Sequence, residues 1–295
     1  MLSFRTSSGV ITGIAFGLMF STSLSFAADI GAPGCIPAVS GLNGKLDGSA
    51  GYLEDDEEEG WRFQGVATLS MPVGCLLGIQ VDVGGGDLDG DEYYGVQGHV
   101  FIRDPESYLL GATAHYVELD GDDVFRAGPE AELYLDSFTL SGVATFEMTD
   151  GDLNDDDLVA GLHATFYATE DFALTAGYRH FLDTDAAALG FEFQPSSWPG
   201  SIYADAMIGT DDYLSIVGGV RFYWGGEDKS LIRRHREDDP WNLFLWLRKA
   251  HASEECPDGG GDDGAGDDGG GDDGGCGGGD DGGGDDGGGD GGDPI

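Results

Sequence analysis

Between residues 42 and 224 the chain repeats one pattern: segments of roughly ten residues alternate apolar with polar side chains and end in a turn or an acidic loop. In one such segment Leu158 and Leu162 fall on one face of an extended chain, while His163 and Thr165 fall on the other. A membrane-spanning β-strand has this length and this period of two. The pattern therefore predicts an all-β fold, a transmembrane antiparallel up-and-down β-barrel.

The number of such segments is twelve, and an even number is typical of single-chain bacterial barrels. Aromatic side chains near the segment ends, such as Trp61, Tyr93, Tyr94 and Tyr213, are expected to form interfacial girdles. The predicted strands lie near 42–53, 61–72, 76–84, 93–103, 108–117, 124–135, 138–148, 158–168, 172–182, 187–194, 201–209 and 213–224.

The connections between these strands differ in charge according to their parity. The odd-numbered connections, among them 54–60 and 84–92, hold 23 acidic residues, whereas the even-numbered ones hold five. In an up-and-down barrel the two sets lie on opposite sides of the membrane, and a β-sandwich gives no reason for such a separation. We expect the acidic set to face outside, where the longer loops of outer-membrane barrels lie.

The N-terminus reads as a secretory signal peptide. Arg5 supplies its positive charge, residues 10–20 its apolar core, and Ser25-Phe26-Ala27 the small residues of a cleavage site. The expected location is therefore the bacterial outer membrane. The predicted regions are the signal peptide (1–27), a periplasmic N-terminal segment (28–41), the barrel (42–224), a periplasmic basic and aromatic segment (225–253) and a disordered Gly/Asp-rich tail (254–295).

Charge narrows the function classes further. The net charge is −43 and only 13 residues are Lys or Arg, which argues against nucleic-acid binding and favours cations as partners. The tail 254–295 holds fifteen acidic residues and almost no apolar surface to offset the entropy of ordering, so we expect it to be disordered.

The basic run 229–236 is expected to form a solvated helix, or to contact anionic lipid headgroups. Residues 241–247 are too few to span a membrane as a helix, so we expect them at the interface or folded against the rim.

Polar residues of inward parity predict the lining of the lumen. Both signs of charge occur among them, so we expect ion pairs across the interior and weak ion selectivity. Whether the lumen is open or plugged stays undecided. The predicted lumen-lining residues are Lys45, Arg62, Arg103, Arg126, Glu130, Glu132, Arg179, Glu192, Asp205, Arg221, His99, His115 and His163.

Two acidic loops place carboxylates at alternate positions, which suits hard cations such as Ca²⁺. A solvated acidic loop is the alternative, and neither loop has the glutamate that completes an EF-hand. Divalent bridging to lipopolysaccharide phosphates is the corresponding functional hypothesis, and no other cofactor is expected. The candidate ligands are Asp87, Asp89 and Asp91 in one loop, and Asp150, Asp152, Asn154 and Asp156 in the other.

Four cysteines occur in the chain. Cys35 and Cys75 both fall on the predicted periplasmic side, which is oxidising, so a disulfide between them is predicted, with free thiols as the alternative. Cys256 and Cys276 lie in the tail, where they could close a loop or link two chains.

Two segments near the end of the predicted barrel resemble known families. The last strand, with Gly219, Phe222 and Trp224, resembles the C-terminal recognition signal of outer-membrane barrel proteins, which implies the barrel-assembly machinery as a partner. Residues 229–240 resemble the tail of uncharacterised proteobacterial outer-membrane barrel and porin-like proteins. The resemblance implies an outer-membrane location, with lipid and lipopolysaccharide as surroundings.

The expected function is a porin-like passive channel for small solutes. The alternative is a non-conducting structural or surface barrel whose acidic loops bind divalent cations. An outer-membrane lipid hydrolase comes third, and we expect no enzyme because neither a G-x-S-x-G nor an H-E-x-x-H motif is present.

Overall fold

The computed structural model describes residues 36–55, 59–119, 122–150, 156–181, 184–196, 198–210, 212–225, 228–238, 240 and 243–244. The signal peptide and the Gly/Asp-rich tail lie outside these residues and stay predictions. Twelve strands and one helix make up the described part. They are β1 (Asn43–Glu54), β2 (Glu59–Val73), β3 (Leu77–Leu88), β4 (Asp91–Asp104), β5 (Tyr108–Leu119), β6 (Asp122–Leu135), β7 (Phe138–Asp150), β8 (Asp156–Thr169), β9 (Phe172–Phe181), β10 (Thr184–Phe193), β11 (Gly200–Gly209), β12 (Leu214–Gly225) and α1 (Leu231–Glu237).

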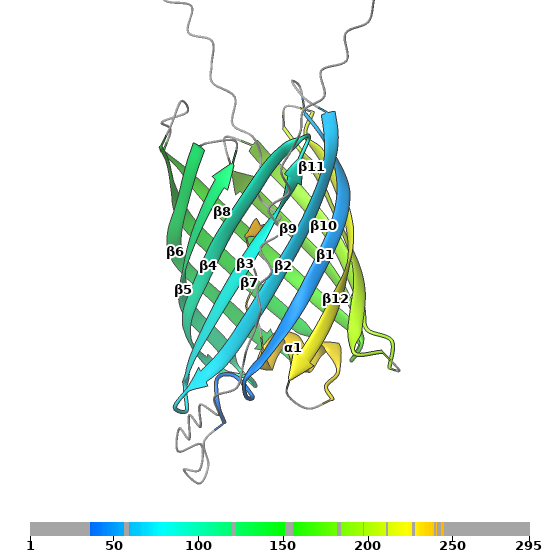
Figure 1. Ribbon diagram of the computed structural model, residues 1–295. Coiled ribbons are helices and arrows are strands. Elements are labelled where there is room, and N and C mark those ends of the chain that lie inside the picture. Colours follow the sequence, from blue (N-terminus) through cyan, green and yellow to red (C-terminus); the bar gives the residue numbers. More distant parts are fainter. Residues whose placement is uncertain are drawn as a thin grey trace, which may run out of the picture. The chain divides into compact units, whose positions relative to one another are not determined.

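The strands form a closed antiparallel barrel in which each strand pairs with its neighbours in the sequence (Figure 1). β1 closes the barrel by pairing with β12 along its whole length, from Asn43 opposite Gly225 to Glu54 opposite Leu214. Closure leaves no unpaired sheet edge, which is what a strand-built protein needs in order to span lipid. The predicted up-and-down topology is confirmed.

All twelve strands occur in the predicted order, with bounds that differ by a few residues. The main difference lies at the acidic end, where the strands run further than expected. The predicted loop 84–92 is a two-residue turn, Asp89-Gly90, whose φ angles are 53° and 89°. Asp-Gly is a pair that accepts positive φ at both positions of a tight hairpin turn, because glycine has no Cβ.

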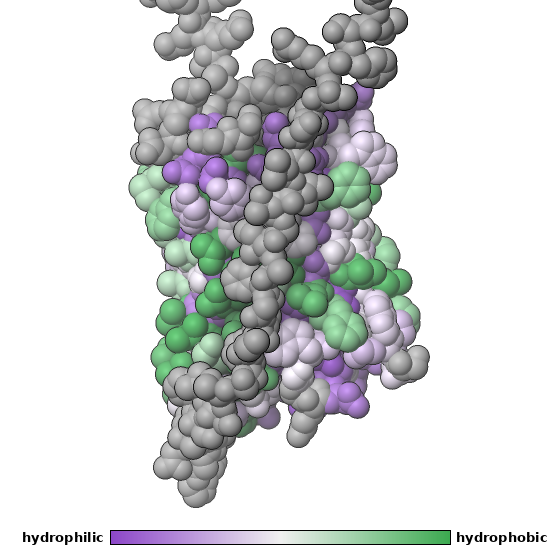
Figure 2. Space-filling view, in the orientation of Figure 1, coloured by the Kyte–Doolittle hydropathy of each residue, from purple (hydrophilic) through white to green (hydrophobic). Residues whose placement is uncertain are grey.

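Exposure alternates along the strands, as predicted. On β4, His99 is 1% exposed and its neighbour Val100 is 53% exposed. Large apolar side chains lie on the outer wall, and Figure 2 shows green patches of apolar residues on both sides of the face in view. Every strand contributes at least one, such as Leu46, Phe63, Val81, Val96, Leu110, Phe125, Leu140, Leu158, Leu174, Leu189, Ile202 and Ile216.

Two aromatic residues expected in the interfacial girdles point inward instead. Trp61 and Tyr94 are exposed on the outer wall, but Tyr93 and Tyr213 are buried inside the barrel. For Tyr93 the reason is parity, since it shares the inward face of β4 with His99. The hydroxyl of Tyr93 donates a hydrogen bond to Gln64 Oε1 at 2.9 Å, so its polar end is satisfied within the lumen.

The helix α1 follows β12 and lies at the end of the barrel opposite the Asp89-Gly90 turn (Figure 1). Its start is held by the turn between β8 and β9, where Leu231 N donates to Asp171 Oδ1 at 3.2 Å. We call this end of the barrel the α1 end, and the opposite one the acidic end. Among the described residues, the helical part is neither long nor apolar enough to cross a membrane.

Candidate functional site: the barrel lumen

The barrel interior holds the charged side chains that the alternation predicts. The structure places all thirteen predicted lumen residues on the inward faces of their strands. Arg62, Arg103, Arg126 and Arg179 are each at most 1% exposed. Burying a charged group is costly unless it is paired with a group of opposite charge. The contacts of these arginines therefore show how the lumen accommodates them.

Arg221 forms a cluster near the α1 end. Its Nε donates to Asp47 Oδ2 at 2.8 Å across the seam between β1 and β12, and its guanidinium also pairs with Glu192. The Tyr203 hydroxyl donates to Asp47 Oδ1 at 2.7 Å, and its ring centre lies 4.1 Å from the guanidinium carbon of Arg221. His235 of α1 approaches Glu192 to 3.3 Å. The cluster therefore connects the wall of the barrel to the helix.

Arg179 forms a second cluster across β8, β9 and β11. Its two terminal nitrogens donate to Asp205 Oδ1 and Oδ2 at 2.9 and 3.0 Å, a bidentate pair. Its Nε donates to His163 Nε2 at 3.0 Å, and Nη1 lies 2.9 Å from the sulfur of Met207. His163 acts here as a hydrogen-bond acceptor.

A third cluster surrounds His99. Its Nδ1 lies 2.9 Å from Glu130 Oε2, and its Nε2 lies 3.4 Å from Asp82 Oδ2. Asp82 also accepts hydrogen bonds from Thr68 at 2.5 Å and from Gln80 at 2.9 Å. The imidazole is thus held between two carboxylates, with further donors on one of them.

Two more arginines of the lumen have partners nearby. Arg126 pairs with Glu147 on the neighbouring strand. Arg103 lies over the ring of Phe101 at 4.7 Å and donates to the carbonyl oxygen of Ala38 at 3.4 Å. Ala38 is fully buried, so the described end of the N-terminal segment packs inside the α1 end of the barrel.

The region after β12 begins with a polar clasp at the α1 end, formed by Ser40, Asn43, Lys229 and Asp238. Asp238 Oδ1 accepts hydrogen bonds from Lys229 Nζ at 2.6 Å, Ser40 Oγ at 2.8 Å and Asn43 Nδ2 at 3.0 Å. Three donors on one carboxylate oxygen fix the place where the chain leaves α1. The clasp therefore ties the C-terminal region to the start of β1.

The basic residues of α1 contact the barrel, which corrects the expectation of a solvated or lipid-facing helix. Arg236 donates to the carbonyl oxygens of Asp136 and Phe138 at 2.9 and 2.8 Å. Arg234 is buried and donates to Gln194 Oε1 at 3.1 Å. The helix therefore closes part of the opening at the α1 end.

Beyond the clasp the chain enters the lumen. The carbonyl oxygen of Pro240 accepts a hydrogen bond from Gln80 Nε2 at 3.4 Å, and the backbone N–H of Leu243 donates to Gln97 Oε1 at 2.9 Å. Gln80 and Gln97 are inward residues of β3 and β4. This corrects the expectation that residues 241–247 lie at the interface or against the rim, because Leu243 contacts a polar side chain inside the lumen.

Phe244 reaches the acidic half of the barrel. Its carbonyl oxygen accepts a hydrogen bond from Arg62 Nη2 at 3.4 Å, and Arg62 is only the fourth residue of β2 from the acidic end. Its ring packs edge-on against His115 with 4.7 Å between ring centres. A Cβ at Gly84 would lie 3.0 Å from the Phe244 ring, so a side chain at this position would push against the ring. Phe244 itself is fully buried.

Buried apolar side chains surround Leu243 and Phe244 and form one cluster with them. They come from nine strands and from the residue preceding β12, and most lie near the acidic ends of their strands. Sequence reasoning missed this set, which we call the apolar collar. It consists of Leu53, Val66, Leu88, Tyr93, Val117, Leu119, Val159, Phe181, Ala186, Ala188, Met207 and Tyr213.

The remaining space in the described lumen includes two small cavities. One of about 110 Å³ lies among Lys45, Arg179, Arg221, His235 and Pro240, and one of about 20 Å³ is partly lined by Leu243. The larger one is lined by charged groups and is roomy enough for several waters. Space for water thus persists between the charged clusters and the C-terminal segment.

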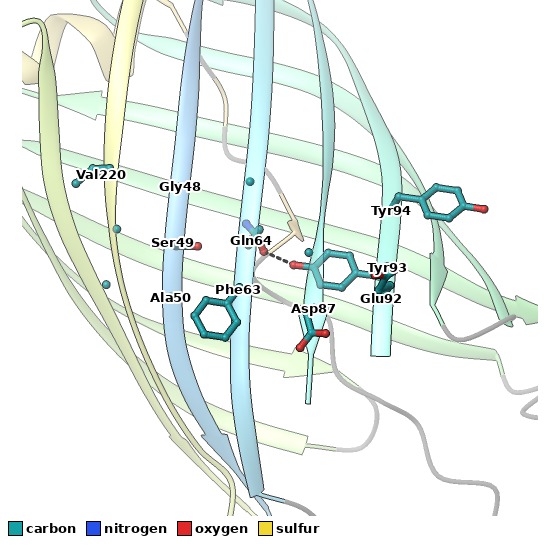
Figure 3. Close-up of a pocket in the computed structure, with 14 residues that line it drawn as sticks. Gly48, Ser49, Ala50, Phe63, Gln64, Asp87, Glu92, Tyr93, Tyr94 and Val220 are labelled. Carbon is teal, nitrogen blue, oxygen red and sulfur yellow. Dashed lines mark hydrogen bonds between the residues drawn. The ribbon is translucent and has the colours of Figure 1, made fainter. Parts of the chain in front are cut away.

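A separate hollow of about 940 Å³ opens on the wall over β12 and β1 to β4. The exposed residues Phe63, Tyr94 and Val220 border it, and Gly48 leaves it open because nothing lies within 4 Å of a Cβ built there. Figure 3 shows Tyr94 pointing away from Tyr93, whose hydroxyl meets Gln64. The lining of the hollow thus includes exposed residues of the outer wall as well as Gln64 and Tyr93, whose side chains face the lumen.

Comparison with known proteins gives structural likeness only. No family model matches the sequence, and no curated protein matches it. Similar solved structures include the KdgM porin in complex with disordered oligogalacturonate (8% identity, TM-score 0.46, covering 61% of this chain and 99% of that one). The outer membrane protein Omp33 of Acinetobacter baumannii is 14% identical, with a TM-score of 0.43 and coverage of 63% and 99%. The COG4313 outer membrane channel of Pseudomonas putida F1 is 11% identical, with a TM-score of 0.45 and coverage of 66% and 100%.

The predicted calcium ligands are only partly within the described residues. Asp87 and Asp91 lie near strand ends. Asp87 Oδ1 accepts a hydrogen bond from Gly90 N at 3.0 Å, so the carboxylate of Asp87 stabilises the turn. No group of three His, Cys, Asp or Glu in the described ranges is arranged to hold a metal ion. The second loop lies outside the description from residue 151 to 155, so a cation site there stays a prediction.

The predicted disulfide is likewise partly within the structure. Cys75 is disulfide-bonded, and its carbonyl oxygen accepts a hydrogen bond from Ala38 N at 2.8 Å. The other three cysteines, Cys35 among them, lie outside the described residues. Pairing of Cys75 with Cys35 stays a prediction, which the closeness of Ala38 to Cys75 favours.

Proposed function

We propose that this protein is an outer-membrane β-barrel. Its strands of 10 to 15 residues suffice for a tilted transmembrane strand, which needs about 9–11. The outer wall is apolar on every strand, whereas the inner wall carries the charges. In water this arrangement exposes far more contiguous apolar surface than a soluble monomer tolerates. The acidic end faces the outside, and the α1 end faces the periplasm.

We further propose that the barrel is a porin-like passive channel for small polar solutes. One observation carries this: a lumen lined with charged clusters runs from α1 into the acidic half. Arg179 with Asp205 and Arg221 with Asp47 set both signs of charge beside one water-sized cavity. A lining of paired charges attracts neither sign strongly, so the solutes are small, polar and of either charge.

A planar lipid bilayer tests the channel. The full chain is recorded beside a chain stopped after residue 239, which keeps α1 and the clasp but lacks the part that enters the lumen. We expect discrete conductance steps from the stopped chain, with a small reversal potential in a salt gradient. Folding is checked by heat-modifiable mobility on gels. Silence from both chains, once they are folded and inserted, would refute the channel.

A second candidate is favoured by the filling of the lumen. Leu243, Phe244 and the apolar collar occupy space that a permanently open pore would leave to water. A non-conducting structural barrel fits this arrangement, and silence from both chains in the bilayer would select it. An enzyme fits less well, because the hydrogen bonds of His99 and His163 go to charged partners of the clusters.

A further inference from the structure

We propose that the lumen holds a binding site for apolar side chains, and that its occupant is the chain's own C-terminal segment, described at Asp238, Pro240, Leu243 and Phe244, which plugs the channel reversibly. This inference rests on the proposed channel function. The segment would be held at two places, the polar clasp at the α1 end and the apolar collar near the acidic end.

The clasp fixes where the segment starts. Asp238 is buried, and Lys229, Ser40 and Asn43 all reach its Oδ1. Ser40 N also donates to the carbonyl oxygen of Glu237 at 3.1 Å. These contacts belong to the rim and leave the lumen free, so the clasp can stay closed while the residues after it move.

The collar binds the apolar end of the segment, Leu243 and Phe244. Leu243 and Phe244 are buried in it, and the wall opposite the Phe244 ring is the backbone of Gly84. Few polar contacts add to this packing, namely those from Gln80, Gln97 and Arg62. Burial of the two large apolar side chains, Leu243 and Phe244, is therefore the main contribution to binding of the segment in the collar, and this binding is non-covalent.

The charged clusters do not depend on the segment. Arg126 pairs with Glu147, Arg179 with Asp205, and Arg221 with Asp47 and Glu192, all within the wall. His99 likewise has Asp82 and Glu130 as wall partners. If the segment left, these pairs would remain, and of the buried charges in the described part of the chain Arg62 would lose one hydrogen bond, from its Nη2 to the carbonyl oxygen of Phe244. A segment that were an ordinary part of the barrel core would not be separable in this way.

The test uses the full chain. Leu243→Asn with Phe244→Asn removes the apolar contacts but keeps the length of the chain, and Ala265→Asn is the matched control in the tail. We expect the double variant to raise the open probability in a planar bilayer by about a hundredfold or more, because truncating buried apolar side chains costs several kcal/mol and 1.4 kcal/mol is a factor of ten. The control should behave like the unsubstituted chain.

A second readout separates this inference from the channel itself. Leu243→Cys in a chain carrying Cys256→Ser and Cys276→Ser is treated with a small maleimide in detergent, and Asp89→Cys serves as the exposed control. Slow reaction at position 243 and fast reaction at position 89 support the plug even when the bilayer is silent. Equal rates overturn the plug. It is overturned as well when the stopped chain conducts but the double variant opens no more often than the unsubstituted chain.

Discussion

The pair Arg179–Asp205 gives the sharpest test of the lumen as described. Replacing Arg179 with methionine keeps most of the apolar stem but leaves Asp205, whose side chain is 14% exposed, without its bidentate partner. Removing one member of a buried ion pair costs about 3–5 kcal/mol, because the other charge stays desolvated. Arg179 also donates to His163, so we expect the free energy of unfolding to fall by the upper half of that range.

The assay is urea unfolding of the protein in lipid vesicles, followed by tryptophan fluorescence. Arg233→Met is the matched control, since Arg233 forms an exposed pair with Glu237 one helical turn away, of a kind that contributes about 0.3–0.5 kcal/mol. The double variant Arg179→Met with Asp205→Leu should recover most of the loss, because it leaves no buried charge. A loss for Arg179→Met no larger than that for Arg233→Met would refute the burial and pairing described for the lumen.

Three further predictions concern the C-terminal region. Gly84→Leu should expel Phe244 and increase channel openings in a bilayer, because a Cβ there already lies 3.0 Å from the ring, whereas Gly48→Leu on the open wall should not. His115→Phe should stabilise the closed state by about 1–2 kcal/mol and lengthen closed times, because neither ring nitrogen of His115, which packs against Phe244, has a hydrogen-bond partner among the described residues. Partial burial raises the pKa of Glu237, but Arg233 and Lys229 outweigh this and hold the pKa below its ordinary value of 4.5. A lowered pKa means that its contribution to the docking of α1 is present at neutral pH and lost as the pH falls through the folded value. The protection factors of the α1 amides, which are the intrinsic exchange rates divided by the observed rates at the same pH, should therefore fall in acid, and Glu237→Gln should abolish that fall.

The barrel could be predicted from the sequence because its signal is local. Side-chain parity within one strand decides which residues face inward, and this placed Arg62, Arg126 and Arg179 correctly without any knowledge of their partners. The strand bounds were less accurate at the acidic end. There Asp87 and Asp91 read as loop residues by composition, although the Asp89-Gly90 turn is so short that both belong to strands.

Side-chain parity also places the residues of the apolar collar on the inward faces of their strands, although their apolar character suggests the lipid side. Leu53 shares the inward face of β1 with Asp47, and Phe181 shares that of β9 with Arg179. An apolar residue near a strand end is usually assigned to the lipid side, as happened for Tyr93. Following parity to the last residue of each strand, instead of following polarity, would have predicted a lumen that is charged in one part and apolar in the other.

The occupant of the collar could not be predicted, because that contact joins residues far apart in the sequence. Phe244 meets Arg62 across 182 positions, and Leu243 meets Gln97 across 146. Residues 241–247 are apolar but too few to span a membrane, so from the sequence a rim and an interface explain them equally well. Only the closed barrel shows that the lumen presents an apolar surface of matching character. The collar and the segment therefore explain each other: an apolar zone has no purpose in a water-filled pore, and Leu243 and Phe244 are buried against that zone.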